Sequence, residues 1–184
     1  MKVVVLDRDG VINEDSDAYV KSLAEWRPIP GSLEAIARLS EAGFTLVVVS
    51  NQSGLARGLF DRATLDAIHA EMQRRVQAAG GRLAGIFFCP HAADAGCDCR
   101  KPKVGLLRQV EAELGVAVEG LPLVGDKASD LQLARRAGCQ PILVRTGYGR
   151  ATERRADLAG VRVFDDLAAV AEALIARDVA AADV

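Results

Sequence analysis

The sequence predicts an α/β protein, a three-layer α/β/α sandwich around a mainly parallel, Rossmann-like sheet. Two observations indicate this fold. Short apolar runs rich in Val, Leu and Ile alternate with segments of helical periodicity, as in strand–helix–strand units. These runs are nearly continuous, which is typical of strands covered on both faces. Right-handed crossovers between the strands are therefore expected.

Three strands and two helices are expected in the first half of the chain. The first strand is "KVVVL", and residues 13–30 after it form an irregular polar segment. A helix from about Ser32 to Ala42 and the strand "FTLVVVS" come next. A longer helix is expected from about Asp61 to Ala79, with Asp61 as its N-cap because carboxylates accept hydrogen bonds from the first turn. The strand "LAGIFFC" follows.

The second half continues the same alternation. It contains a helix from about Val104 to Leu114, the strand "LPLVG", a helix near Ser129 to Ala137 and the strand "QPILV". A short "VRVF" strand and an Ala-rich helix complete the chain. Because there is no repeat, low-complexity tract or linker, we expect one domain over residues 1–184.

Composition excludes several classes of partner. A net charge of −2 and an isoelectric point near 5.7 give no general attraction to nucleic acids or anionic membranes. The chain begins without a secretory signal pattern, and no apolar segment reaches the length of a membrane span. We therefore expect a cytoplasmic monomer without nucleic-acid or membrane partners.

Charged and hydroxyl side chains follow the predicted strands in a pattern that suits phosphoryl transfer. Asp7 and Asp9 lie two residues apart after the first strand, Ser50 ends the second, and Asp126 follows the fourth; Lys101 precedes a helix. In parallel sheets such strand ends share one edge, so we expect these groups to meet there. Two adjacent carboxylates repel each other unless they share a cation or a proton.

Each of these groups has an expected role. Asp7 is the candidate nucleophile that carries an aspartyl phosphate, and Asp9 is the candidate general acid and base, with a pKa raised by Asp7. Magnesium is expected on the carboxylates of Asp7 and Asp126 with the Asp9 carbonyl oxygen. Ser50 and Lys101 would hold the non-bridging phosphate oxygens.

The segment "CPHAADAGCDC" contains three thiols and an imidazole. Cys89, His91, Cys97 and Cys99 have a composition and spacing that suit tetrahedral zinc. Four protein ligands leave no open position for water, so residues 89–99 are predicted to form a structural zinc-binding loop that fixes the segment leading into Lys101. A redox cluster is the alternative.

Simpler interpretations exist for single residues. The Asp7 and Asp9 pair alone suits a turn cap, and Ser50 suits an ordinary turn hydroxyl. His69 lies in the middle of a predicted helix and is expected to be a surface or boundary side chain. Cys139 is expected to pack in the core.

The motifs "LDRDGVIN", "SNQSGLARG", "CPH…CDCRKP", "GDKASD" and "VRTGYG" stand in an order that resembles haloacid dehalogenase (HAD) superfamily phosphatases. Within the superfamily they resemble the bacterial heptose 1,7-bisphosphate 7-phosphatases. This resemblance implies a HAD-like fold with a minimal cap, a small phosphorylated sugar as substrate, and magnesium held by Asp7, Asp9 and Asp126. It also implies substrate contacts from Asp15, Tyr19, Ser50, Asn51, Gln52, Ser53, Arg100, Lys101 and Lys127.

One segment departs from the family pattern. Where "GYV" is expected the chain reads "DAYV", with one extra residue, so the contacts of Asp15 and Tyr19 rest on a weaker match than the others. Residues 13–30 are interpreted as a small flap over the site.

Three alternative functions remain open. Histidinol phosphate is an alternative substrate because the short zinc loop also resembles histidinol-phosphate phosphatases, but "NQSGLARG" and "RTGYG" resemble the heptose family better. A nucleic acid 3′-phosphate is disfavoured by the acidic isoelectric point. A phospho-accepting receiver domain also uses magnesium, aspartates and a lysine, but its accepting aspartate would follow a middle strand.

Overall fold

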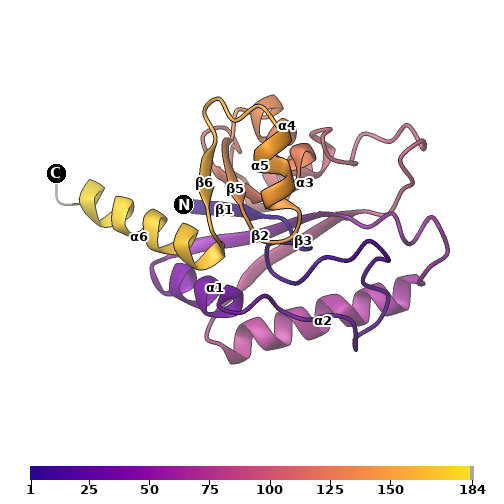
Figure 1. Cartoon of the computed structure of the whole chain (residues 1–184). Helices are drawn as coiled ribbons and strands as arrows, with labels where there is room; N and C mark the ends of the chain where they lie inside the picture. The colour runs from indigo at the N-terminus through magenta and orange to yellow at the C-terminus, as the bar shows by residue number, and fades with distance from the viewer. Residues whose placement is uncertain (183–184) are drawn as a thin grey trace.

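In the computed structural model, which describes residues 1–182, six strands form one parallel sheet with the order β3-β2-β1-β4-β5-β6 (Figure 1). This arrangement confirms the predicted fold class. The strands are β1 (Lys2–Leu6), β2 (Phe44–Asn51), β3 (Leu83–Cys89), β4 (Pro122–Gly125), β5 (Gln140–Val144) and β6 (Arg162–Phe164).

Helices cover both faces of the sheet. α1 and α2 pack on one face together with α6, while α3 and α4 cover the other, with α5 on the same side (Figure 1). Their bounds are α1 (Ser32–Glu41), α2 (Arg62–Ala78), α3 (Gly105–Leu114), α4 (Ala128–Arg136), α5 (Gly149–Arg155) and α6 (Leu167–Ala182). The result is the predicted three-layer sandwich.

The apolar run of β1 supplies both halves of the core. Val4 and Leu6 belong to the cluster under α1, α2 and α6, whereas Val3 and Val5 belong to the cluster under α3 and α4. This division follows from the two-residue period of a strand, which directs successive side chains to opposite faces. Because both faces of this central strand are covered, its buried side chains are all apolar, which explains the continuous Val and Leu run.

Most predicted elements agree with the structure to within one or two residues. The cap of α2 is confirmed, since the Thr64 N–H donates to Asp61 Oδ1 at 2.8 Å. The helix α5 was missed, because it is short and Gly149 at its start gives neither a side-chain cap nor an apolar period. Among residues 1–182 no helix combines the length and hydropathy that a membrane span requires. The single-domain assignment stays a prediction.

The strand order creates a crevice at the carboxyl end of β1. From β1 the chain continues to β2 and β3 on one side and later returns to β4, β5 and β6 on the other. Loops after neighbouring strands diverge at such a switch point and leave room for a ligand. Asp7 follows β1 and Asp126 follows β4, so both lie at this crevice.

Two glycines let separate loops close around Asp126. Gly10 has φ +86° and Gly147 has φ +55°, both in the left-handed region that favours glycine. A Cβ atom would stand 2.1 Å from Asp126 Oδ2 at Gly10 and 2.3 Å from it at Gly147. The two loops also bond to each other, because Thr146 Oγ1 donates to the Gly10 carbonyl at 2.6 Å.

Because of this close approach, replacing Gly147 by alanine should lower the free energy of unfolding more than the same change at a glycine with open space around it. Gly160 is the matched control, since its φ is +71° and a Cβ atom added there would meet no other atom within 4 Å. Gly160→Ala should lower the free energy of unfolding by about 1 kcal/mol through left-handed strain alone. Gly147→Ala should lower it by at least about twice that amount, because Asp126 has to move as well. Urea unfolding measures both values, and equal losses would contradict the packing argument.

Candidate active site

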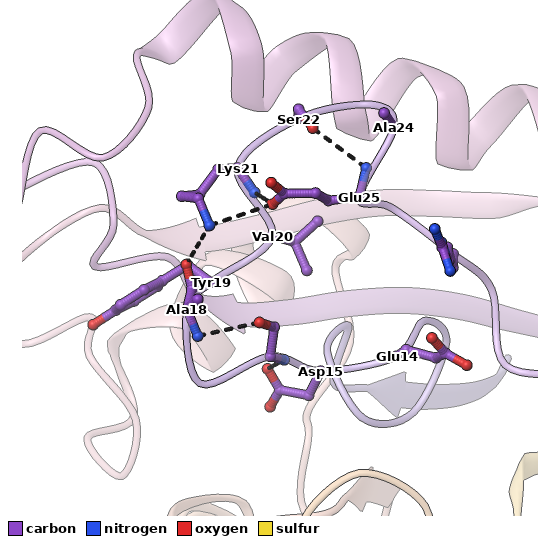
Figure 2. A pocket seen from close by; sticks show the side chains of 11 residues that line it. Glu14, Asp15, Ala18, Tyr19, Val20, Lys21, Ser22, Ala24 and Glu25 are labelled. Carbon is purple, nitrogen blue, oxygen red and sulfur yellow. Dashed lines mark hydrogen bonds and ion pairs between the residues drawn. The ribbon is translucent and has the colours of Figure 1, made fainter.

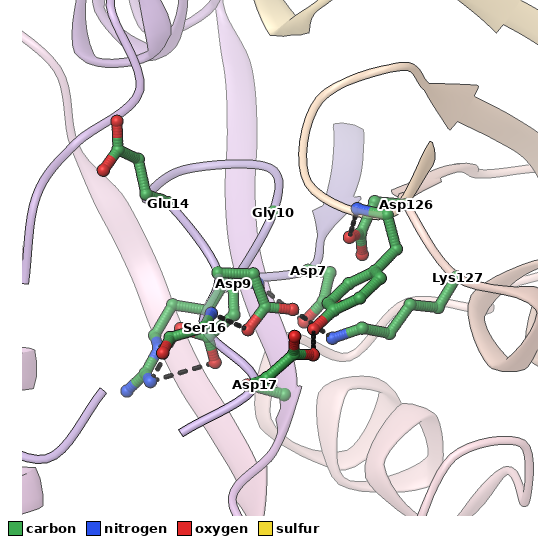
Figure 3. A network of polar contacts seen from close by, with 12 residues as sticks. Asp7, Asp9, Gly10, Glu14, Ser16, Asp17, Asp126 and Lys127 are labelled. Atoms are coloured by element: carbon green, nitrogen blue, oxygen red, sulfur yellow. Dashed lines mark hydrogen bonds and ion pairs between the residues drawn. The ribbon is translucent and has the colours of Figure 1, made fainter. Parts of the chain in front are cut away.

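Three buried carboxylates and one ammonium group form the floor of the crevice. Asp7 after β1, Asp126 after β4 and Asp130 in α4 each place a carboxylate oxygen within 4.8 Å of the others. Lys101 Nζ lies 2.8 Å from Asp7 Oδ1 and 2.7 Å from Asp130 Oδ1. Figure 3 shows the side chains of Asp7, Asp126 and Lys127 gathered at this place.

Lys101 is held in position by its backbone as well as by its ammonium group. The Asn51 side chain accepts from the Lys101 N–H at 3.0 Å and donates to its carbonyl at 3.2 Å. Lys101 Nζ also donates to the Val49 carbonyl at 3.0 Å. The amide of Asn51, predicted to contact substrate, is therefore engaged with the chain that carries Lys101.

Burial and mutual repulsion act on the carboxylates. Burial raises the pKa of Asp7 to about 6, against the opposing charge of Lys101. Burial and the charge of Asp7 raise the pKa of Asp126 to about 8. Burial alone would lower the pKa of Lys101, but Asp130 and Asp7 outweigh it and the pKa rises. The raised pKa values of Asp7 and Asp126 indicate too little positive charge near these carboxylates. The raised pKa of Lys101 keeps its ammonium group protonated.

The donor set fits a magnesium ion. Asp7, Asp126 and Asp130 share the ammonium group of Lys101, whereas Lys127 is paired with Asp15, so the three ionised carboxylates carry an excess negative charge. Asp126 Oδ1 is buried and has no hydrogen-bond partner among the described residues, while Oδ2 accepts from the Tyr148 N–H at 2.8 Å. A hard cation with oxygen ligands satisfies both the free oxygen and the excess charge.

Asp9 has a different environment from the one predicted. Its carboxylate accepts from Arg8 Nη2 at 2.8 and 2.9 Å, from Asn13 Nδ2 at 2.9 Å and from Gln52 Nε2 at 2.8 Å. Burial would raise the pKa of Asp9, but Arg8 and these hydrogen bonds lower it below its ordinary value. The expectation of a pKa raised by Asp7 is wrong for this arrangement. The carboxylate in the cluster with Asp7 and Asp126 is that of Asp130. The Asp9 carbonyl oxygen stays a predicted magnesium ligand.

Two further residues of this region were not identified from the sequence. Asp130 lies in the motif "GDKASD" but received no role, although its spacing places it in the first turn of α4. His69 was expected at the surface or a boundary, and it is buried, with 7% of its surface exposed. Arg8 Nη1 lies 3.2 Å from His69 Nε2, a contact between elements that no sequence pattern indicates.

Ser50 and Gln52 continue the polar network from the end of β2. Gln52 Nε2 donates to Ser50 Oγ at 2.8 Å, and Gln52 Oε1 accepts from Arg8 Nη2 at 3.1 Å. Ser50 and Ser53 are both buried. Ser50 therefore lies at the crevice as predicted, in a network that also holds Asp9; its role stays a prediction.

A cavity of about 320 Å³ adjoins this floor, and Lys101 is the member of the cluster that lines it. Asp15 and Tyr19, from the segment of residues 13–30 that was predicted to form a flap, line one side, and Arg100 and Lys127 lie on others. The flap itself stays a prediction. Its full lining comprises Asp9, Asp15, Ser16, Asp17, Tyr19, Val20, Asn51, Gln52, Ser53, Arg100, Lys101, Lys127, Ser129 and Tyr148. The structure thus brings all the predicted substrate-contact residues except Ser50 to the lining of this one cavity.

Residues 14–27 also curl around a second hollow of about 600 Å³ (Figure 2). Asp15 and Tyr19 line both cavities, while Lys21 and Glu25 join across the second, with the Lys21 N–H donating to Glu25 Oε2 at 2.8 Å. Asp9 and Lys101, which line the smaller cavity, do not line this one. The smaller cavity is therefore the one in which the chemistry can occur.

The predicted zinc ligands converge in the loop after β3. Cys89 Sγ lies 3.5 Å from His91 Nδ1 and 3.7 Å from Cys97 Sγ, and His91 Nδ1 lies 3.2 Å from Cys99 Sγ. All four donor atoms are within 4.8 Å of one another. Separations of this size are those of atoms at the corners of a tetrahedron around zinc.

Comparisons with known proteins agree with this geometry. Residues 98–170 match the HAD-hydrolase-like family. The chain is 54% identical over 173 residues to the D-glycero-β-D-manno-heptose-1,7-bisphosphate 7-phosphatase of Pseudomonas aeruginosa, covering 94% of this chain and 97% of that protein. It is 56% identical over 176 residues to the protein of the same name from Bordetella bronchiseptica, covering 95% and 98%. The chain belongs to the D-glycero-β-D-manno-heptose-1,7-bisphosphate 7-phosphatase family.

Solved structures of this phosphatase family show the same fold. The Bordetella bronchiseptica phosphatase, crystallised with magnesium and phosphate, has a TM-score of 0.94 and 55% identity, over 96% of this chain and 99% of that one. The Burkholderia thailandensis phosphatase has a TM-score of 0.76 and 43% identity, over 95% and 99%. The predicted resemblance to HAD phosphatases is confirmed, and the receiver-domain hypothesis is wrong.

The bonds between Asn51 and Lys101 predict that Asn51→Ala lowers activity without unfolding the protein. Lys101 would lose both backbone bonds, so its ammonium group would be less well fixed beside Asp7. We expect kcat/KM for phosphate release to fall by about tenfold, equal to about 1.4 kcal/mol. Steady-state kinetics measures the loss, and thermal unfolding controls for stability. Unchanged kcat/KM would show that Nζ is fixed by its own ion pairs alone.

Proposed function

We propose that this chain is a magnesium-dependent phosphatase that removes the 7-phosphate of D-glycero-β-D-manno-heptose 1,7-bisphosphate. The observation that carries this proposal is the cluster of Asp7, Asp126, Asp130 and Lys101, which adjoins through Lys101 a cavity of about 320 Å³. Membership of the heptose bisphosphate phosphatase family supplies the substrate class.

Asp7 is the proposed nucleophile. One of its carboxylate oxygens forms a bond to phosphorus while the bond from phosphorus to the sugar oxygen breaks, which gives an aspartyl phosphate. Water then attacks that phosphorus and releases inorganic phosphate and the free carboxylate. Lys101 beside Asp7 Oδ1 supports this role, because it keeps one oxygen neutralised and oriented at the end of β1.

Asp9 is the proposed general acid and base. In its protonated form it gives a proton to the departing sugar oxygen, and as a carboxylate it takes one from the attacking water. Its place in the lining of the cavity, two residues from Asp7, supports this role. The donors around it in this structure favour the carboxylate form, which is the form that activates water.

Ser50 and Lys101 are proposed to bind the non-bridging oxygens of the transferring phosphate. A magnesium ion on Asp7, Asp126 and the Asp9 carbonyl would supply further positive charge to these oxygens. Asp130 holds Lys101 from the other side, so the ammonium group is shared between the nucleophile and a fixed carboxylate. This arrangement places positive charge where negative charge develops in the transition state.

The remainder of the substrate is proposed to lie toward the mouth of the cavity. Arg100 and Lys127 line its wall, and both are cations suited to the ring oxygens or the 1-phosphate. The primary 7-phosphate is the less hindered end and reaches the buried floor. Binding of the outer part then orients the reacting phosphate.

The test is phosphate release with magnesium from heptose 1,7-bisphosphate, fructose 1,6-bisphosphate, histidinol phosphate and a 3′-phosphorylated oligonucleotide. Heptose bisphosphate should give the highest kcat/KM, and phosphorus NMR should show a product that keeps its 1-phosphate. Asp7→Asn should abolish turnover while the protein still unfolds in one cooperative thermal transition. Faster turnover of histidinol phosphate, or a product that keeps its 7-phosphate, would contradict the assignment.

We also propose that Cys89, His91, Cys97 and Cys99 bind a structural zinc ion. Their converging donor atoms support this proposal, and the loop they would close leads directly into Arg100 and Lys101. Lys103 Nζ donates to the Cys97 carbonyl at 2.7 Å, which ties the same loop to the start of α3. A closed site of four protein ligands orders a segment that has little apolar content.

Metal analysis of the purified, reduced protein should find about one zinc per chain. Cys97→Ser should lose the zinc and lower the melting temperature, because the loop would lose a ligand. Cys139→Ser is the control: the Cys139 thiol is buried, donates to the Val118 carbonyl and is not one of the four converging donors, so this variant should keep full zinc content. Zinc-free protein from a preparation without chelator would refute the site.

A further inference from the structure

The side chain of Arg8 is the least expected polar group in the molecule. It lies between the candidate nucleophile and the candidate acid, and only 1% of its surface is exposed. A buried guanidinium group is costly unless each of its N–H donors is satisfied. The hydrogen-bond partners of Arg8 therefore identify the groups that hold its side chain in place.

Those partners come from the loop after β1, the loop after β2 and the helix α2. Arg8 Nε and Nη2 donate to Asp9, Nη2 also donates to Gln52 Oε1, and Nη1 lies 3.2 Å from His69 Nε2 in α2. An arginine can only donate, so His69 Nε2 must be the acceptor and the imidazole must be neutral. In keeping with this, burial and the charge of Arg8 lower the pKa of His69 to about 4.

We infer that His69 is a positioning residue for proton transfer by Asp9, acting through Arg8. His69 fixes the free end of the guanidinium group, and the opposite edge of that group holds both oxygens of the Asp9 carboxylate. His69 and Arg8 do not line the cavity of about 320 Å³, whereas Asp9 does. His69 therefore affects the reaction through the orientation of Asp9 and not through contact with the substrate.

The position of His69 is itself well defined. α2 carries it against the sheet, and its ring packs edge-on to Phe88 with centroids 5.4 Å apart. The helix packs on the sheet through Leu65, Ile68 and Met72, which are fully buried. A rigid helix thus provides one fixed acceptor for a side chain that has four rotatable bonds.

Two amide variants at position 69 separate this role from a packing role. The Oε1 of His69→Gln reaches about as far as Nε2 and can accept from Arg8, whereas the shorter amide of His69→Asn cannot. The inference rests on the proposed acid role of Asp9, so the substrates are chosen by their leaving groups. Heptose bisphosphate releases an alkoxide that needs a proton, and 4-nitrophenyl phosphate releases a phenolate that does not.

His69→Asn should lower kcat/KM for heptose bisphosphate by on the order of tenfold and for 4-nitrophenyl phosphate by less than about twofold. His69→Gln should stay within about threefold of the parent on both substrates. His69→Leu, which keeps the volume and removes the acceptor, should behave as His69→Asn does and replaces it if that variant fails to fold. Thermal unfolding controls for stability.

Asp9→Asn distinguishes the two ways in which the inference can fail. If Asp9→Asn loses much more activity on heptose bisphosphate than on the aryl phosphate while His69→Asn loses both equally, His69 has only a packing role. Equal kcat/KM values for His69→Gln and His69→Asn would also overturn the inference. If Asp9→Asn itself shows no dependence on the leaving group, the acid role fails and the inference fails with it.

Discussion

The ammonium group of Lys101 is the interaction on which the geometry of the site depends. It joins Asp7, Asp130 and the Val49 carbonyl, and so connects the ends of β1 and β2 to the start of α4. A lysine and two carboxylates in this position are almost inaccessible to water. Their attraction is little screened, whereas any one of them left alone would carry a large desolvation cost. The charges therefore fix one another, and they also fix the loop after β1, the Lys101 loop and the start of α4 relative to one another.

This constraint explains why the loop that carries Lys101 has so many independent supports. Asn51 binds the Lys101 backbone on both sides, and the Cys and His cluster lies immediately before it. The loop has little apolar surface to bury, so it cannot be held by packing as the strands are. Directed polar contacts replace the hydrophobic effect here, and they specify the position of Nζ more sharply than packing would.

The sequence predicted the fold well because the strands and helices depend on local patterns. Continuous Val and Leu runs, the Asp61 cap and the alternation of elements are visible within short windows, and the strand-end rule then brings Asp7, Ser50 and Asp126 together. The orientation of Asp9 and the burial of His69 were not predictable in that way. Both depend on Arg8, whose partners come from distant parts of the chain. Two carboxylates two residues apart suggested mutual repulsion, but the arginine between them gives each a different environment.

The extra residue in "DAYV" illustrates how a departure from a pattern becomes interpretable only in three dimensions. Asp15 forms an ion pair with Lys127, and the Tyr148 hydroxyl bonds to Asp17, so the flap is fixed to the loops after β4 and β5 at two points. Asp15 and Lys127 were both predicted to contact substrate, yet here they neutralise each other. A phosphorylated ligand that binds Lys127 has to compete with the Asp15 carboxylate for the same ammonium group. Because one anion would replace another, the charge of Lys127 would stay balanced in such an exchange.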